Sequence, residues 1–156
     1  TYTKLHAMIE AVPESDRMIH GDYHTKNIVL AGDEVLVIDM DTLSEGDPIF
    51  EFMAIFSAYV GFNELDHSVS QAFLGIPFET SEHIWNETVR LYCGTDDEKR
   101  VEQTKMRGEI LGQVRILGRA LRRRKRGIDE DPMQTDHCVA RLRELVPQVD
   151  RLSFEG

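Results

Sequence analysis

The chain has 156 residues, 41% of them hydrophobic, and a formal net charge of −10. This length suits one compact domain with a buried core, and no apolar run approaches the roughly 20 residues of a membrane-spanning helix. Residues 1–95 hold 16 Asp and Glu against 4 Lys and Arg, which disfavours nucleic acid as a partner and mildly favours metal or cationic ligands. A solvated acidic surface explains the same charge equally well. Overall we expect a soluble, cytoplasmic protein.

The predicted elements indicate a mostly helical α+β fold. A short helix over residues 5–12 ends at Pro13, and a loop follows. Two β-branched runs, residues 28–30 and 35–38, flank a four-residue connection and predict a β-hairpin. After Gly46, Asp47 suits a helix N-cap and Pro48 the first helical position of a buried helix. Further helices are predicted over residues 63–73, 81–93, 97–126 and 135–145.

The helix predicted over residues 97–126 shows the clearest periodicity. Apolar side chains recur every three or four residues, which predicts one buried stripe: Met106, Ile110, Val114, Leu117 and Leu121. Its last turns carry the basic run RALRRRKR, residues 119–126. The run could bind nucleic acid or an acidic partner. We favour a structural role, because cations complement the carbonyl dipole at a helix C-terminus and the acidic residues 129–131 follow at once.

The loop before the hairpin carries the strongest candidates for catalytic and metal-binding residues. His20, Gly21, Asp22 and Asn27 form H-G-D-x-x-x-x-N, and Asp39 follows the second strand. Transfer of a phosphoryl group from ATP to a hydroxyl needs an acceptor for the hydroxyl proton and oxygen ligands for Mg²⁺. In this interpretation Asp22 is the base, while Asn27 and Asp39 bind the metal. Gly21 permits a tight turn, and His20 fixes the loop by hydrogen bonding.

Three motifs in this order resemble the aminoglycoside phosphotransferase and choline kinase-like family, relatives of protein kinases. HGDYHTKN resembles its catalytic loop, VIDMD its metal-binding segment, and GDPIFEFM the element that opens the next helix. In the last motif Glu51 stands where the family usually has Asp. The resemblance implies ATP- and Mg²⁺-dependent transfer to a hydroxyl of a small molecule, such as an aminoglycoside, choline or another amino alcohol, a sugar or homoserine.

Such kinases also carry an N-terminal lobe with a phosphate-covering loop and an ATP-binding Lys. No G-x-G-x-x-G occurs here, and 17 residues precede Met18. We therefore expect residues 1–156 to be the C-terminal lobe of a longer enzyme, inactive without its N-terminal lobe. An apolar face left exposed where that lobe docks could make the fragment self-associate.

Alternatives remain open. Asp22, Asn27 and Asp39 could be ordinary turn residues, and the chain could be a non-catalytic kinase-like scaffold. His20, Asp22 and His24 could instead ligate a metal, as in metal-dependent phosphoesterases. Asp41 and Glu45 could support the metal or attract a cationic acceptor, or simply be solvated. Trp85 and Tyr59 could line an acceptor pocket, although their apolar neighbours favour the core.

Overall fold

A computed structural model describes residues 1–128 and 132–154. Within these ranges the chain forms the helices α1 Tyr2–Glu10, α2 Ile49–Phe56, α3 Ser68–Leu74, α4 Phe78–Cys93, α5 Glu98–Lys125 and α6 Pro132–Leu145. Its strands are β1 Met18–Ile19, β2 Ile28–Ala31, β3 Glu34–Val37 and β4 Ser44–Glu45. The antiparallel pairs β1–β4 and β2–β3 make two small sheets. The expected mostly helical α+β class is confirmed, and the arrangement is compatible with a kinase-like C-terminal lobe. Among the described helices, none has the length and apolar character to cross a membrane.

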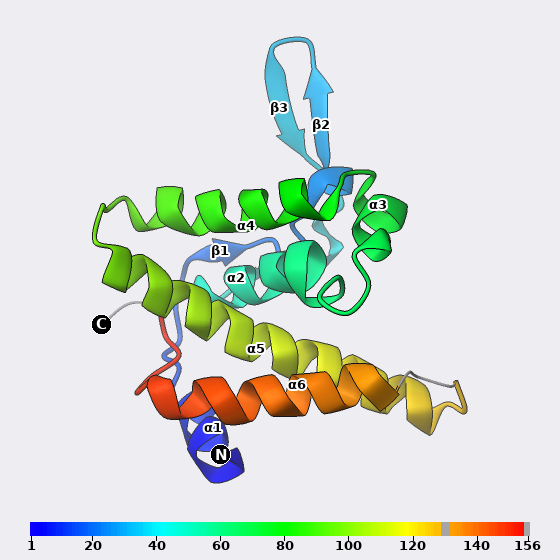
Figure 1. Ribbon diagram of the computed structural model, residues 1–156. Helices are drawn as coiled ribbons and strands as arrows, with labels where there is room; N and C mark the ends of the chain where they lie inside the picture. Colours follow the sequence, from blue (N-terminus) through cyan, green and yellow to red (C-terminus); the bar gives the residue numbers. More distant parts are fainter. Residues whose placement is uncertain (129–131, 155–156) are drawn as a thin grey trace.

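The core forms where α2 packs against α5, with α4 on one side of α5 and α6 on the other (Figure 1). Two glycines of α5 allow the close approach. A Cβ on Gly108 would lie 2.9 Å from the Trp85 ring, and one on Gly112 would overlap the Phe56 ring. Trp85 and Tyr59 are 5% and 2% exposed, so the core interpretation of both residues is confirmed.

The predicted stripe on α5 is incomplete. Ile110 is fully buried, but Leu121 is 48% exposed. A second face of the helix is buried against α2 and α4, and several of its residues are small or polar, so a search for large apolar side chains overlooks them. It comprises Val101, Thr104, Gly108, Gly112, Ile116 and Ala120. The helix buries two faces because it lies between α2 on one side and α6 on the other.

Several element bounds also differ from the prediction. The hairpin connection has two residues rather than four, because Ala31 and Glu34 still pair and Gly32 turns the chain with φ of +64°. Residues 63–67 are not helical, and α3 begins at Ser68, whose N–H is accepted by Asp66 Oδ1 at 3.0 Å. The loop predicted before His20 contains the short strand β1, which pairs with β4.

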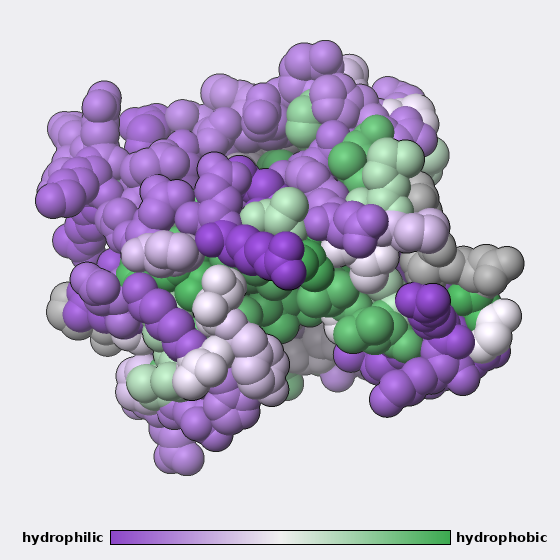
Figure 2. All heavy atoms as spheres, turned by 60° about the horizontal axis from the view of Figure 1, so that its bottom comes forward, coloured by the Kyte–Doolittle hydropathy of each residue, from purple (hydrophilic) through white to green (hydrophobic). Residues whose placement is uncertain are grey.

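The β2–β3 hairpin projects away from the helices (Figure 1). Unusually for a two-stranded ribbon, it exposes large apolar side chains: Val29, Leu30, Val35, Leu36 and, just beyond β3, Ile38. Hydrophobic side chains also gather in a band across the side of the molecule that Figure 2 shows. A groove of about 570 Å³ is lined by apolar residues of α1, α5 and α6, among them Leu5, Ile9, Val114, Leu117, Val139 and Leu142.

Candidate active site

The loop after β1 is held from several sides through its backbone. The Glu51 carboxylate of α2 accepts the His20 N–H and, at 3.1 Å, the Gly21 N–H. Thr42 Oγ1 donates to the His20 carbonyl at 2.6 Å, and Arg115 of α5 donates to the Gly21 carbonyl at 3.0 Å. Gly21 adopts φ of +76°, a region that suits glycine. The expected tight turn at Gly21 is therefore present, and Glu51, the departure from the family pattern, takes part in fixing it.

His20 is buried, and both of its ring nitrogens form hydrogen bonds with the protein backbone. Nδ1 accepts the Asp22 N–H at 3.3 Å, so Nε2 carries the proton and donates to the Ile38 carbonyl at 2.9 Å. These bonds link the loop to the end of the hairpin. They agree with a positioning role for His20, and they leave no ring nitrogen for the metal array with Asp22 and His24.

Asp22 directs its carboxylate toward a cleft. Its side chain is 44% exposed, with Oδ2 at 3.5 Å from His24 Nε2 and Oδ1 at 3.8 Å from the Arg115 guanidinium. Both distances are too long for good hydrogen bonds. His24 is itself buried against the Phe73 ring, and its Nδ1 has no partner in the described part of the chain. An accessible carboxylate on an anchored backbone is what a general base requires.

Asn27 and Asp39 lie at the base of the hairpin. The Ile38 N–H donates to the Asn27 carbonyl at 2.9 Å, which extends the β2–β3 ladder by one pair and brings the two flanking segments together. Buried Asn27 donates its side-chain amide to the Asp22 carbonyl at 2.9 Å, and this leaves its amide oxygen available. Asp39 is exposed, with φ of +61°. Among non-glycine residues such a conformation is uncommon and often found at functional sites.

The two supporting acidic residues differ. Asp41 is exposed in the single 3₁₀ turn Met40–Thr42. Asp47 is 2% exposed and accepts the Ile49 N–H at 2.9 Å, so its carboxylate satisfies the first N–H of α2. The N-cap itself is Pro48 and the helix begins at Ile49, one residue later than predicted. Asp47 also accepts the N–H of Phe154, which ties the C-terminal segment to this helix start. Asp47 thus has a structural role.

The cleft beside Asp22 was not predicted. It has a volume of about 430 Å³ and combines arginines of α5 with apolar side chains; its lining includes Arg115, Arg119, Arg122, Phe62, Val69 and Phe73. Two of these arginines belong to the basic run that we assigned to the helix end. Arg122 does lie in the last turn of α5, as expected, but the run also contributes to the cleft. Residues 129–131 lie outside the described residues. The spacing Arg115, Arg119, Arg122 at four and three residues was the available signal.

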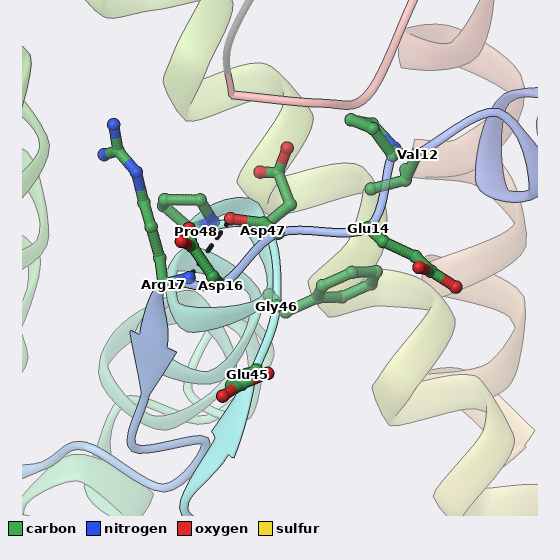
Figure 3. Close-up of a pocket in the computed structure, with 11 residues that line it drawn as sticks. Val12, Glu14, Asp16, Arg17, Glu45, Gly46, Asp47 and Pro48 are labelled. Carbon is green, nitrogen blue, oxygen red and sulfur yellow. Dashed lines mark hydrogen bonds between the residues drawn. The ribbon is translucent and has the colours of Figure 1, made fainter.

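A second hollow, of about 920 Å³, opens between the α1–β1 loop and the start of α2 (Figure 3). Its lining includes Glu14, Asp16, Glu45 and Asp47. In Figure 3 the carboxylates of Glu14, Glu45 and Asp47 point in different directions, and none of Asp22, Asn27 or Asp39 contributes to it. This hollow does not assemble the predicted catalytic residues.

Within the described residues, no three or more His, Cys, Asp or Glu side chains cluster closely enough to hold a metal ion. The predicted pair, one carboxylate and one amide, falls below that number. Mg²⁺ in phosphotransferases commonly takes only one or two carboxylates, and phosphate oxygens and water complete its shell. The donor chemistry of Asn27 and Asp39 therefore fits a magnesium ion that binds together with a nucleotide.

A family model described as the phosphotransferase enzyme family matches residues 3–82. The match extends from α1 into α4 and includes the whole anchored loop and the hairpin. The chain belongs to this family, which confirms the resemblance found in its motifs and indicates phosphotransferase activity in general. No curated protein and no solved structure matches the chain significantly.

Proposed function

We propose that the protein transfers the γ-phosphate of ATP to a hydroxyl group of a small molecule. The observation that carries this proposal is the Asp22 carboxylate, which is accessible from a cleft although its backbone is fixed by Glu51, His20 and Arg115. In the reaction the acceptor oxygen forms a bond to the γ-phosphorus as the bond to the bridging oxygen of ADP breaks. Asp22 accepts the proton of the hydroxyl and orients the attacking oxygen.

Asn27 and Asp39 would bind Mg²⁺ at the base of the hairpin. Magnesium would neutralise the charge that develops on the phosphate oxygens. The hydrogen bond that the Asn27 side-chain amide donates to the Asp22 carbonyl couples this proposed metal ligand to the proposed base. Asn27 would therefore keep the proposed metal ligand and the proposed proton acceptor in one rigid unit.

We further propose that this chain acts as the C-terminal lobe of a kinase-like enzyme and needs an ATP-binding lobe. The exposed hairpin supports this view, because it has apolar pairs on both faces, Val29 with Leu36 on one and Leu30 with Val35 on the other, and Leu30 is 76% exposed. Exposed apolar surface commonly marks an interaction site. A neighbouring lobe would cover the hairpin and enclose the nucleotide against Asp39.

The test is ADP release by the complete protein that contains this chain, with Mg-ATP and a panel of aminoglycosides, amino alcohols, sugars and hydroxy acids. We expect release that depends on acceptor and on Mg²⁺ and disappears in Asp22→Ala. The matched control is Glu82→Ala, an exposed carboxylate on α4 outside both the cleft and the hairpin, which should behave as wild type. If folded protein binds Mg-ATP yet transfers phosphate to no acceptor, the proposal is wrong and the scaffold hypothesis gains support.

A further inference from the structure

The cleft beside Asp22 differs in charge from the rest of the protein. The chain carries 28 acidic and 18 basic residues, but the cleft lining contains three arginines and one carboxylate, Asp22 itself. Among the described residues, no acidic side chain pairs with Arg119 or Arg122. The acidic front half of the chain, which mildly favoured a cationic ligand, therefore does not set the charge next to the proposed base.

The three arginines are engaged to different degrees. Arg115 is held by the Gly21 carbonyl and lies beside Asp22. Arg119 lies over the Phe62 ring at 4.9 Å, a cation–π contact that fixes the guanidinium plane and leaves its edge available. Arg122 is exposed and folds back over Gly118. Arg119 and Arg122 thus offer N–H donors that the protein itself does not use.

Most of the remaining lining is apolar. Phe62, Val69 and Phe73 face the cleft together with Ala54 and Ala58. Aromatic rings and small apolar side chains exclude water from a ligand that covers them, and this strengthens hydrogen bonds between guanidinium groups and an anion. The lining is therefore complementary to a molecule with a nonpolar body and a negatively charged group.

From this arrangement we infer that the phosphoryl acceptor is a hydroxy compound with a carboxylate or phosphate group, bound by Arg119 and Arg122. The inference rests on the proposed function. We assign this anion to the acceptor and not to ATP, because Asn27 and Asp39, the proposed ligands of the magnesium ion that accompanies ATP, are not part of the cleft. Moreover, Arg119 and Arg122 follow Arg115 by four and seven residues, roughly 6 and 10 Å along the helix. An acceptor whose hydroxyl meets Asp22 would place its anionic end against them.

The test uses sets of acceptors with the same carbon chain and different charge, such as 4-hydroxybutyrate, butane-1,4-diol and 4-aminobutan-1-ol, with longer and aromatic analogues of each. Transfer from Mg-ATP by the complete protein is measured for wild type, Arg119→Gln and Arg122→Gln. Arg124→Gln is the matched control, since it removes an equal charge from the same last turn of α5 outside the cleft. We expect the anionic set to be preferred. Loss of one charge-assisted contact should raise its KM roughly tenfold or more, with kcat less affected.

Two other outcomes overturn the inference, and they are distinguishable from failure of the proposed function. If cationic or neutral acceptors are preferred, Arg122→Gln does not change their KM and Asp22→Ala abolishes transfer, the proposed function is correct. The inference of an anionic acceptor is then wrong. If nothing is phosphorylated, a binding measurement decides: NMR titration of the complete protein with the anionic set should shift the arginine side-chain signals, and Arg122→Gln should weaken that binding. Equal binding of all three sets would contradict the inference.

Discussion

Glu51 illustrates how one side chain can organise a reactive loop. Its Oε2 accepts the N–H groups of both His20 and Gly21, whereas Oε1 is buried without a partner in the described residues. A carboxylate that receives two backbone N–H donors compensates for its burial. The longer Glu reaches the loop from α2, so the departure from the usual Asp preserves an acceptor for these donors.

Replacement of Glu51 should therefore loosen the loop. We expect Glu51→Ala to lower the free energy of unfolding by about 1–3 kcal/mol, because two buried N–H groups lose their acceptor, and to lower transfer activity more than Glu51→Gln, which keeps one amide oxygen. Urea unfolding and the rate of transfer by the complete protein measure both effects. Unchanged activity in a stable Glu51→Ala variant would show that the loop is held without it.

The sequence predicted the turn at Gly21 but neither the distant anchors of the loop nor the cleft. The bonds from the Asp22 N–H to His20 and from the Asn27 amide to the Asp22 carbonyl span two and five positions, whereas Glu51 and Thr42 reach His20 across 31 and 22 positions. Arg115 reaches Gly21 across 94 positions of the chain. Such a contact depends on how α5 packs against the loop, which no local pattern specifies.

The close packing of helix α5 depends on Gly108 and Gly112, which have no side chain. We expect Gly112→Ala to destabilise the protein by about 1–3 kcal/mol, since the added methyl group would overlap the Phe56 ring and force the α2–α5 interface apart. Gly118→Ala, in the same helix, meets only Arg122 at 3.4 Å and should stabilise by about 0.5–1 kcal/mol. Thermal unfolding compares them. Equal effects of the two substitutions would argue against this helix packing.

The pairing of α5 with α6 should give stability a pH dependence. Burial raises the pKa of Glu109, and the hydrogen bond from Arg141, at 2.8 Å, opposes that rise. A raised pKa means that the folded state holds this proton more tightly than the unfolded chain does. Its contribution to stability is therefore present in acid and is lost as the pH rises through the folded pKa.

Arg141→Met removes the opposing hydrogen bond and should raise the pKa of Glu109 further. We expect it to destabilise by about 1–3 kcal/mol near neutral pH, and by less in acid, below the folded pKa of Glu109, where the carboxyl is protonated. The control Glu144→Gln removes the other, exposed partner of Arg141 and should change stability by less than about 1 kcal/mol. Denaturant titrations at several pH values test this, and a pH-independent loss in Arg141→Met would refute it.

Element bounds were harder to predict than element types. Helices α2, α4, α5 and α6 form close to their predicted ranges. Pro48 and Asp97 are the N-caps of α2 and α5, and Gly94 is the C-cap of α4. The start of α3 was misplaced, since residues after the π-helix Ser57–Gly61 are tied back by the Asn63 amide to the Tyr59 carbonyl at 3.0 Å. That contact spans only four residues, but it depends on the π-helix before it, which the apolar pattern does not predict.

For the whole molecule, the exposed hairpin should govern association. A two-stranded ribbon with unpaired edges and apolar side chains readily pairs with another copy. We expect the chain by itself to self-associate, and Leu30→Lys combined with Val35→Lys to restore the monomer in light scattering. The control Leu91→Lys on α4, where Leu91 is 70% exposed, should leave the self-association unchanged. A monodisperse wild-type chain at high concentration would contradict this expectation.

The role of Asp22 as the base can be tested with a single isosteric substitution. Single-turnover transfer from saturating Mg-ATP to the best acceptor of the panel is compared for the complete wild-type protein and Asp22→Asn, an isosteric change that removes the base. We expect a rate lower by roughly 10²–10⁴-fold with ATP binding unchanged. A rate within a few-fold of wild type would contradict the assignment of Asp22 as the base.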